Sequence, residues 1–280
     1  MFDLTAVQSA VRDSGLDGWL LYDFRGSNVL AQRVCDLDTK KLSRRWFYYV
    51  PAEGEPRKLV HAIEPAALDH LPGTAKTTYR RWRDLETGVG ELVIGAKRVA
   101  MEYSPRNANP YIGRVDAGTV ELVKSYRVEV VPSGDLIQLF EATWDADQEK
   151  SHFEAAGHCR DAYDVAFAFI ASEIKATGKT TEAAVQARIM AHFADRGMTT
   201  YSPPIVGVGP HSGDPHYDTT PASNTPVVPG SWVLIDLWAK MNRPRAVYAD
   251  YTRVAYVGAD VPEQYVKVFN VVAAARDAGI

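Results

Sequence analysis

The sequence has only two cysteines, Cys35 and Cys159, among its 280 residues. They are far apart and form neither a Cys-x-x-Cys pair nor a metal-binding spacing, which argues against a disulfide framework and fits a reducing compartment. No apolar run approaches the length of a transmembrane helix. The first 15 residues lack the basic segment and apolar stretch that define a signal peptide. These absences predict a cytoplasmic protein without a membrane partner.

The chain also lacks an excess of positive charge, since its formal net charge is −4. A nucleic acid or an anionic membrane is therefore not an expected partner. The basic residues Lys40, Lys41, Arg44 and Arg45 lie close together without interleaved aromatic residues, and this pattern favours a solvated loop. The hydrophobic fraction of 46% is average for a globular protein, and the length allows two domains with cores of their own.

The first half of the chain alternates short apolar runs with helical patterns. This alternation predicts an α/β domain over residues 1–142. It contains no nucleotide-binding fingerprint. The predicted strands are 18–22, 46–50, 58–63, 98–102 and 127–131, and the predicted helices are 4–14, 64–71, 82–93 and 114–125.

The composition changes near residues 142–148. Two helical patterns follow, one running to about Thr177 with Gly178 just beyond it, and one from about Thr181 to Arg196. Strands come next, near residues 204–209 and on both sides of a turn at 240–246. We therefore expect an α+β domain over residues 143–280.

The two strands around that turn carry the chemistry. A turn centred on Arg243 places Asp236 directly opposite Asp250. Period-two alternation then assigns one face to the core and the other to the two acids. The predicted core face holds Val233, Ile235, Leu237, Val247, Ala249 and Tyr251, and the acidic face also carries Trp238, Tyr248 and Thr252.

Two carboxylates facing each other on paired strands repel. At roughly 4–5 Å and an effective dielectric of about 20, the repulsion is roughly 3–4 kcal/mol. A shared proton or bound divalent cations would relieve it. The alternative is that one acid lies at the strand margin in water and the register is a coincidence. Because Trp238 and Tyr248 share the face with Asp236 and Asp250, the cation site is favoured.

These strands resemble a known family. The blocks IDLWAK and VYADYTRVAYVG look like the metal-binding strand pair of the pita-bread metallopeptidases, which include aminopeptidase P, prolidase, methionine aminopeptidase and creatinase. The resemblance implies that Asp236 binds one metal ion and that Asp250 bridges two, with Thr252 and Arg253 completing the second motif. Manganese is the favoured metal, and cobalt or zinc is the alternative.

The loop before the strand pair extends the resemblance. In VGVGPHSGDPHYD, His216 stands where the family places a histidine that contacts the substrate near the scissile carbonyl, so it is the candidate catalytic residue. His211 and Tyr217 are expected nearby. With Trp238, Tyr248 and Thr252 they complete the candidate residues that bind substrate or support the ligands. The sequence has no Gly-x-Ser-x-Gly elbow, which argues against a serine hydrolase.

The N-terminal half is also similar to the domain that precedes the catalytic domain in aminopeptidase P, prolidase and creatinase. Its segment GLDGWLLYDFRGSN is typical of the first strand and following loop of that domain. The resemblance predicts a creatinase-type N-terminal domain at 1–142 and the first part of a pita-bread domain at 143–280.

The sequence departs from the family pattern after Asp250. The family adds a histidine and two glutamates on later strands, whereas the last histidine here is His216 and Glu263 is the only later glutamate. Glu263 begins a predicted helix at 262–277, where an acidic residue complements the helix dipole. We therefore expect an incomplete pita-bread domain that belongs to a longer enzyme. These 280 residues alone should bind metal weakly and be inactive.

The resemblance implies a metal-dependent aminopeptidase or dipeptidase of the Xaa-Pro type. Such an enzyme hydrolyses the bond after an N-terminal residue through a hydroxide bound to two metal ions, and His216 would stabilise the developing charge. The expected partners are a short peptide or dipeptide substrate and, by resemblance only, a second copy in a homodimer. One alternative is a non-catalytic pita-bread module that binds peptides or proteins. Another is a creatinase-like amidinohydrolase, which needs no metal; the presence of both Asp236 and Asp250 argues against it.

Overall fold

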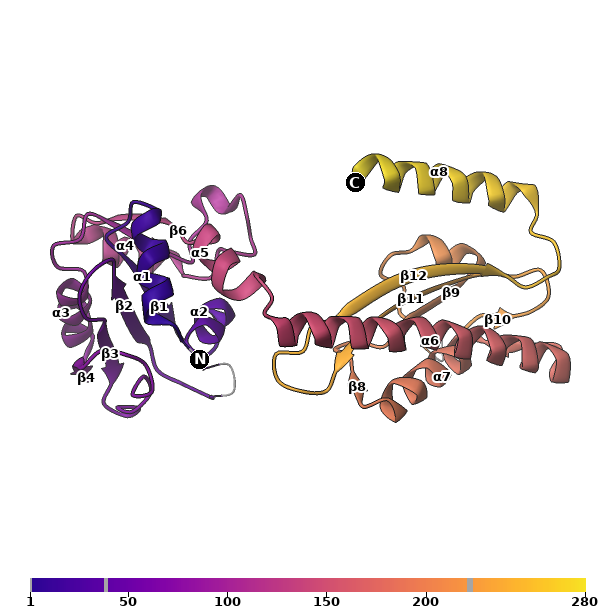
Figure 1. Cartoon of the computed structure of the whole chain (residues 1–280), viewed down its shortest axis with the longest axis horizontal. Coiled ribbons are helices and arrows are strands. Elements are labelled where there is room, and N and C mark those ends of the chain that lie inside the picture. Colours follow the sequence, from indigo (N-terminus) through magenta and orange to yellow (C-terminus); the bar gives the residue numbers. More distant parts are fainter. Residues whose placement is uncertain (1, 38–39, 221–223) are drawn as a thin grey trace. The chain divides into compact units, whose positions relative to one another are not determined.

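The computed structural model describes residues 2–37, 40–220 and 224–280. The chain forms two compact units, Met1–Thr143 and Trp144–Ile280 (Figure 1). No helix within the described residues is both long and apolar enough to cross a bilayer.

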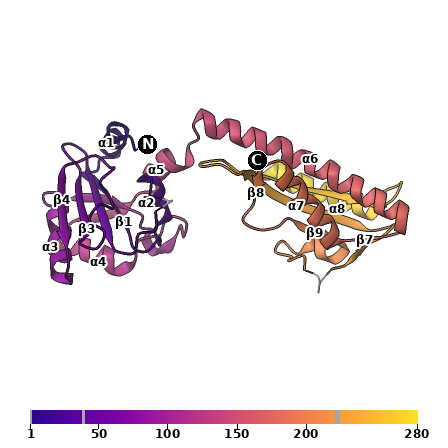
Figure 2. The same ribbon diagram turned by 90° about the horizontal axis from the view of Figure 1, so that it is seen from below.

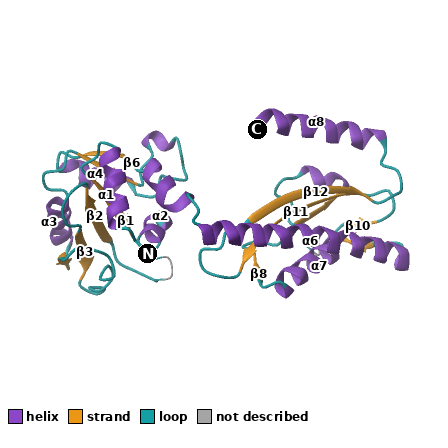
Figure 3. Ribbon diagram, viewed as in Figure 1, coloured by secondary structure: helices purple, strands orange, loops and turns teal. Residues whose placement is uncertain are grey.

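The first unit is built on a six-stranded sheet with the order β4-β3-β2-β1-β5-β6. Its strands are β1 Gly18–Asp23, β2 Trp46–Pro51, β3 Arg57–His61, β4 Ala75–Tyr79, β5 Arg98–Met101 and β6 Glu129–Pro132. Its helices are α1 Leu4–Asp13, α2 Val29–Val34, α3 Trp82–Leu92, α4 Ala117–Ser125 and α5 Gly134–Ile137, and short helical turns occur at Pro105–Asn107 and Gln138–Ala142 (Figure 3).

Both faces of the central strands β1 and β2 are buried, which explains their continuous apolar sequences. Along β1, Trp19 and Leu21 belong to a core on one face, while Leu20 and Tyr22 belong to a core on the other. Helices α1, α2 and α5 supply residues to the first core, and α3 and α4 supply residues to the second. The mixed α/β architecture predicted for this part of the chain is confirmed.

One predicted element of the first unit is wrong, and two of its observed elements were not predicted. The helix expected at 64–71 is a series of single turns, in which the amide of Ala67 bonds to Glu64 and that of Leu71 to Leu68. Strand β4 was not predicted because its side chains are mostly exposed and carry no apolar signal. Helix α2 was also missed; it spans only six residues and begins at the Asn28 cap.

The second unit combines long helices with an antiparallel sheet (Figure 2). Strand β11 lies at the centre, paired with β12, β9 and, at its end, β8. The helices are α6 Ala146–Thr177, α7 Glu182–Asp195 and α8 Glu263–Gly279, with a short 3-10 turn at Gly209–Gly213. The strands are β7 Thr180–Thr181, β8 Met198–Thr199, β9 Ile205–Val208, β10 Pro226–Val227, β11 Trp232–Met241 and β12 Ala249–Tyr256.

The sequence predicted the ends of α6 and α7 closely. Asp145 caps α6 through a reciprocal bond pair with Gln148, and Gly178 ends the helix with a left-handed φ of 79°. The hydroxyl of Thr181 accepts the amide of Ala184 and begins α7. These capping signals involve only residues near each helix end, so they can be predicted without knowledge of the tertiary packing.

Alternation along β11 is complete. Val233, Ile235, Leu237, Ala239 and Met241 are buried against α6 and α7. The predicted core face is wrong on the partner strand, where Tyr251 is 39% exposed and Val247 lies before the strand begins. On β12 only Ala249 is buried.

Helix α8 has no buried residue, and Val268, Phe269, Val271 and Val272 are exposed on it. Its described ring contacts come from Tyr265, which stacks on Trp232 at 4.9 Å and approaches Tyr256 at 5.7 Å. Figure 1 shows α8 separated from the layer formed by β11 and β12.

Candidate active site

The register of β11 and β12 differs from the prediction by two residues. Asp236 is paired with Thr252, and Asp250 is paired with Trp238. The two aspartates are therefore diagonal neighbours instead of facing partners. A shift of two preserves the face, so both acids still project from the same side of the sheet. Diagonal positions are roughly 7–8 Å apart, so their repulsion is weaker than for facing acids.

The prediction failed because the connection is not a symmetric turn. Strand β11 continues to Met241, but its last residues pair with β8, where Lys240 lies opposite Thr199. Residues 242–248 then form a loop, and β12 begins at Ala249. Arg245 in this loop has a positive φ of 58°, which few non-glycine residues adopt.

Helix α6 holds this register through side chains that bond to the backbone just before and within β12. The ring N–H of His152 donates from Nδ1 to the carbonyl of Tyr248 at 2.8 Å. Further along the helix, the buried Tyr163 hydroxyl lies 3.2 Å from the carbonyl oxygen of Ile235 and 2.5 Å from that of Tyr251. The Tyr163 hydroxyl therefore contacts both β11 and β12 from the side of the sheet that packs against α6.

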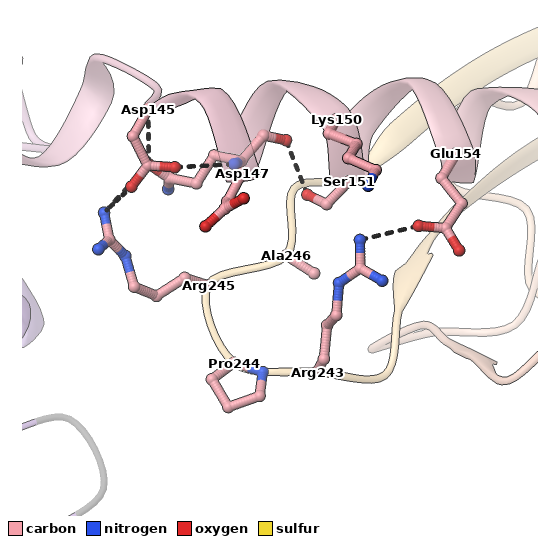
Figure 4. A pocket seen from close by; sticks show the side chains of 10 residues that line it. Asp145, Asp147, Lys150, Ser151, Glu154, Arg243, Pro244, Arg245 and Ala246 are labelled. Carbon is pink, nitrogen blue, oxygen red and sulfur yellow. Dashed lines mark hydrogen bonds and ion pairs between the residues drawn. The ribbon is translucent and has the colours of Figure 1, made fainter.

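The loop before β12 is also attached to α6, around a cavity of about 560 Å³ (Figure 4). Arg243 pairs with Glu154 at 2.8 Å, and Arg245 pairs with Asp145 at 2.9 Å. The exposed fractions of these four side chains range from 38% for Glu154 to 62% for Arg245. Beneath them, the amide of Val247 donates to the hydroxyl of the buried Ser151 at 3.0 Å.

We expect the buried contact to matter more than the ion pairs. Replacing Ser151 with alanine leaves the Val247 amide without its acceptor and should lower the free energy of unfolding by about 1–2 kcal/mol. Replacing Arg243 with alanine removes an exposed ion pair and should lower it by less than about 1 kcal/mol. Urea unfolding of the two variants measures both changes, and the reverse ranking would contradict this account.

Asp236 and Asp250 line a second cavity, of about 500 Å³. Trp238, His216 and Tyr217 line it too, so the structure brings these five sequence-predicted residues together. The other lining residues are Gln186, Tyr201, Ser202, Pro203, Pro204, Ile205, Pro215, Asp218 and Thr219.

Three further predicted residues contact this lining without belonging to it. The hydroxyl of Thr252 donates to Asp236 Oδ1 at 2.6 Å and orients that carboxylate. Tyr248 contacts the ring of Tyr201, with centroids 5.8 Å apart. His211 stacks on Tyr217 at 4.1 Å.

The two neighbouring carboxylates, Asp236 and Asp250, affect each other's electrostatics in this cavity. Burial raises the pKa of Asp250 above its ordinary value, and the charge of Asp236 raises it further. A cation would remove the second of these effects. Within the described residues, however, no group of three or more His, Cys, Asp or Glu side chains is placed to hold a metal ion. The two aspartates are thus a partial donor set.

An aromatic wall borders the two acids. Tyr201 is 80% exposed, and its ring lies 5.8 Å from that of Trp238. The indole Nε1 of Trp238 is buried and has no hydrogen-bond partner among the described residues. A buried donor left unpaired costs about 1–3 kcal/mol, which an acceptor on a ligand would offset.

Sequence reasoning missed Tyr201 and Glu182. Tyr201 precedes Ser-Pro-Pro and carried no pattern beyond its aromatic ring. Glu182 looked like an ordinary acid in the first turn of α7, yet its carboxylate is fully buried and accepts four hydrogen bonds. Its one available signal was an acidic residue directly after a Thr cap.

The sequence of the second unit is similar to that of a known protein family. Residues 152–280 match the sequence profile of metallopeptidase family M24. The matched residues include both Asp236 and Asp250, in agreement with the resemblance that their motifs predicted. No curated protein sequence matches the chain significantly.

Solved structures share the fold over nearly the whole chain. Dipeptidase PepE from Mycobacterium ulcerans is similar with a TM-score of 0.67 and 20% identity over 93% of this chain. The prolidase from Pyrococcus horikoshii OT3 gives 0.61 and 17% over 98%. An X-Pro aminopeptidase from Thermotoga maritima MSB8 gives 0.61 and 16% over 96%. The chain spans 65% of the PepE dipeptidase and 70% of each of the other two.

Proposed function

We propose that the cavity at Asp236 and Asp250 binds divalent metal ions and takes part in the hydrolysis of short peptides. The observation that carries this proposal is the placement of both carboxylates on one face of adjacent strands, lining one cavity with His216. The match of residues 152–280 to the sequence profile of metallopeptidase family M24 supports it. Manganese is the metal we favour, with cobalt or zinc as the alternative, because oxygen ligands do not choose firmly among them.

The residues present fit one side of a metal site. Asp236 and Asp250 would hold the ions through their oxygens, and the Thr252 hydroxyl fixes the orientation of the first carboxylate. The pKa of Asp250 is raised first by burial and second by the charge of Asp236, and a cation would offset the second effect. Divalent ions would supply Lewis-acid polarisation of a peptide carbonyl and activation of water.

We assign His216 the role of binding substrate at the rim of this cavity. It is exposed, its backbone N–H donates to Asp214 Oδ1 at 2.9 Å, and its imidazole has no hydrogen-bond partner among the described residues. The ring is therefore available to donate a hydrogen bond to a peptide carbonyl as negative charge develops there.

The finer activity we propose is cleavage after an N-terminal residue, as an Xaa-Pro dipeptidase or aminopeptidase. The names of the structural neighbours, a dipeptidase, a prolidase and an X-Pro aminopeptidase, support this choice. A cavity of about 500 Å³ also suits a ligand of dipeptide size. In the same scheme, residues 1–142 are a creatinase-type N-terminal domain and residues 143–280 are part of the catalytic domain.

Titration of the chain with manganese tests the site. We expect binding weaker than micromolar, because two carboxylates offer few of the donors that offset ion dehydration. Asp236→Asn should weaken binding at least about tenfold, and Asp260→Asn, at an exposed aspartate outside the cavity, should leave it unchanged. Sub-micromolar binding would contradict the partial donor set, and equal binding by the two variants would contradict the site.

A second candidate is a peptide-binding module without catalysis. The exposed Tyr201 ring beside Trp238, whose indole Nε1 has no hydrogen-bond partner among the described residues, favours it. In this case an Xaa-Pro dipeptide should shift the Trp238 indole resonance equally with and without manganese. A shift that requires manganese would support the metal-dependent function instead.

A further inference from the structure

The buried carboxylate of Glu182 receives four hydrogen bonds from three separate parts of the second unit. Its Oε1 atom accepts the amide of Val208 at 2.8 Å and lies 2.9 Å from His211 Nδ1. Its Oε2 atom accepts the hydroxyl of Tyr217 at 2.7 Å and the amide of Thr225 at 2.8 Å. The four acceptor positions of an ionised carboxylate are thereby filled.

This pattern is more than a favourable charge at a helix start. A fully buried carboxylate is costly unless donors surround it, and here the donors come from distant segments. Val208 ends β9, His211 and Tyr217 lie on the following loop, and Thr225 directly precedes β10. One side chain at the start of α7 therefore connects both ends and the middle of the segment that links β9 to β10.

The candidate catalytic residue lies inside this connected segment. His211 and Tyr217 stack with ring centroids 4.1 Å apart and planes 24° apart, and both ring systems reach Glu182. His216 directly precedes Tyr217. Its neighbours on both sides, Pro215 and Tyr217, line the cavity with it.

We propose that Glu182 is a positioning residue for His216. Acting through His211 and Tyr217, it holds the segment between β9 and β10 that carries His216 (the His216 loop) at the cavity. The proposal rests on the proposed function in the role it gives to His216. It assigns His211 to the anchor of the loop instead of to substrate binding, in keeping with its absence from the cavity lining. Glu182 itself touches neither the two aspartates nor His216 in the described contacts.

Amide hydrogen exchange of the whole chain tests the anchor. In Glu182→Gln, the side-chain carboxamide has one acceptor oxygen and cannot accept from all four donors. The backbone N–H groups of Val208, Tyr217 and Thr225 should therefore exchange about 10- to 100-fold faster. Amides of α6 and β12 should keep their rates. Glu149→Gln is the matched control, because Glu149 also lies in the first turn of a helix but is exposed. It removes the same charge from a helix start without removing an anchor.

Two results would overturn the proposal. One is unchanged exchange at Val208, Tyr217 and Thr225 in Glu182→Gln. The other is equal acceleration throughout residues 144–280, which would mean that Glu182 supports the unit as a whole. Should Glu182→Gln fail to fold, Tyr217→Phe provides the same test, since it removes one donor and keeps the ring. We expect it to accelerate exchange about 3- to 10-fold at Tyr217 and Thr225 only.

Manganese separates this inference from the proposed function. Paramagnetic Mn²⁺ held at Asp236 and Asp250 should broaden the ring signals of His216 in the wild-type chain. At equal occupancy, Glu182→Gln should show less broadening because His216 is no longer held in place. Absence of broadening in the wild type would refute the metal site, while the exchange rates would still decide whether Glu182 anchors the loop.

Discussion

Replacing Tyr163 with alanine should lower the free energy of unfolding of residues 144–280 by about 3–5 kcal/mol. The side chain is fully buried in the core between α6 and the sheet, so truncation opens a cavity the size of a phenol ring. The same change removes the hydroxyl that joins the carbonyls of Ile235 and Tyr251. Loss of packing and loss of the bridge therefore act in the same direction.

Tyr163→Phe separates these two contributions. It keeps the ring and removes only the hydroxyl, so we expect a loss of about 1 kcal/mol. Urea unfolding followed by circular dichroism measures both variants. Equal losses for phenylalanine and alanine would mean that the bridge, and not packing, dominates. A loss below about 1 kcal/mol for alanine would contradict the placement of this ring in the core.

Replacing Asp250 with asparagine should change metal binding and stability in opposite directions. Removing a ligand should weaken manganese binding by at least about 10- to 100-fold, since even the loss of a ligand's hydrogen-bond partner has that effect. Without metal, the same substitution removes a charge that burial and Asp236 disfavour. Because Asp250 is largely exposed, we expect a gain of only about 0.5 kcal/mol in the free energy of unfolding at neutral pH.

The gain should depend on pH in a defined way. The folded-state pKa of Asp250 lies above its ordinary value of 3.8, so the unfolded chain releases this proton more readily. The wild-type chain therefore loses stability as the pH rises from about 3.8 through the folded-state pKa. Unfolding free energies measured from pH 3 to pH 7 should show the advantage of Asp250→Asn growing over this window. An advantage that grows toward low pH would contradict the sign of the shift.

The sequence by itself determined much of the second unit. The Asp145 and Thr181 caps and Gly178 are local signals, and they set where α6 begins and ends and where α7 begins. The alternation along β11 fixed its buried face, because a strand has a period of two wherever it lies. The same period kept Asp236 and Asp250 on one face even though their pairing was predicted two residues out of place.

Tertiary structure alone decided which residues face each other. The register of β12 depends on α6, whose Tyr163 and His152 lie roughly 90 residues earlier in the chain, and on β8, which takes the end of β11. No pattern within residues 232–256 contains that information. Glu182 is a similar case, since its donors come from residues 208–225 and a single acid in a first turn predicts only a dipole interaction. Local signals specify elements and faces, whereas the pairing of carboxylates and the anchoring of a loop depend on contacts between distant segments.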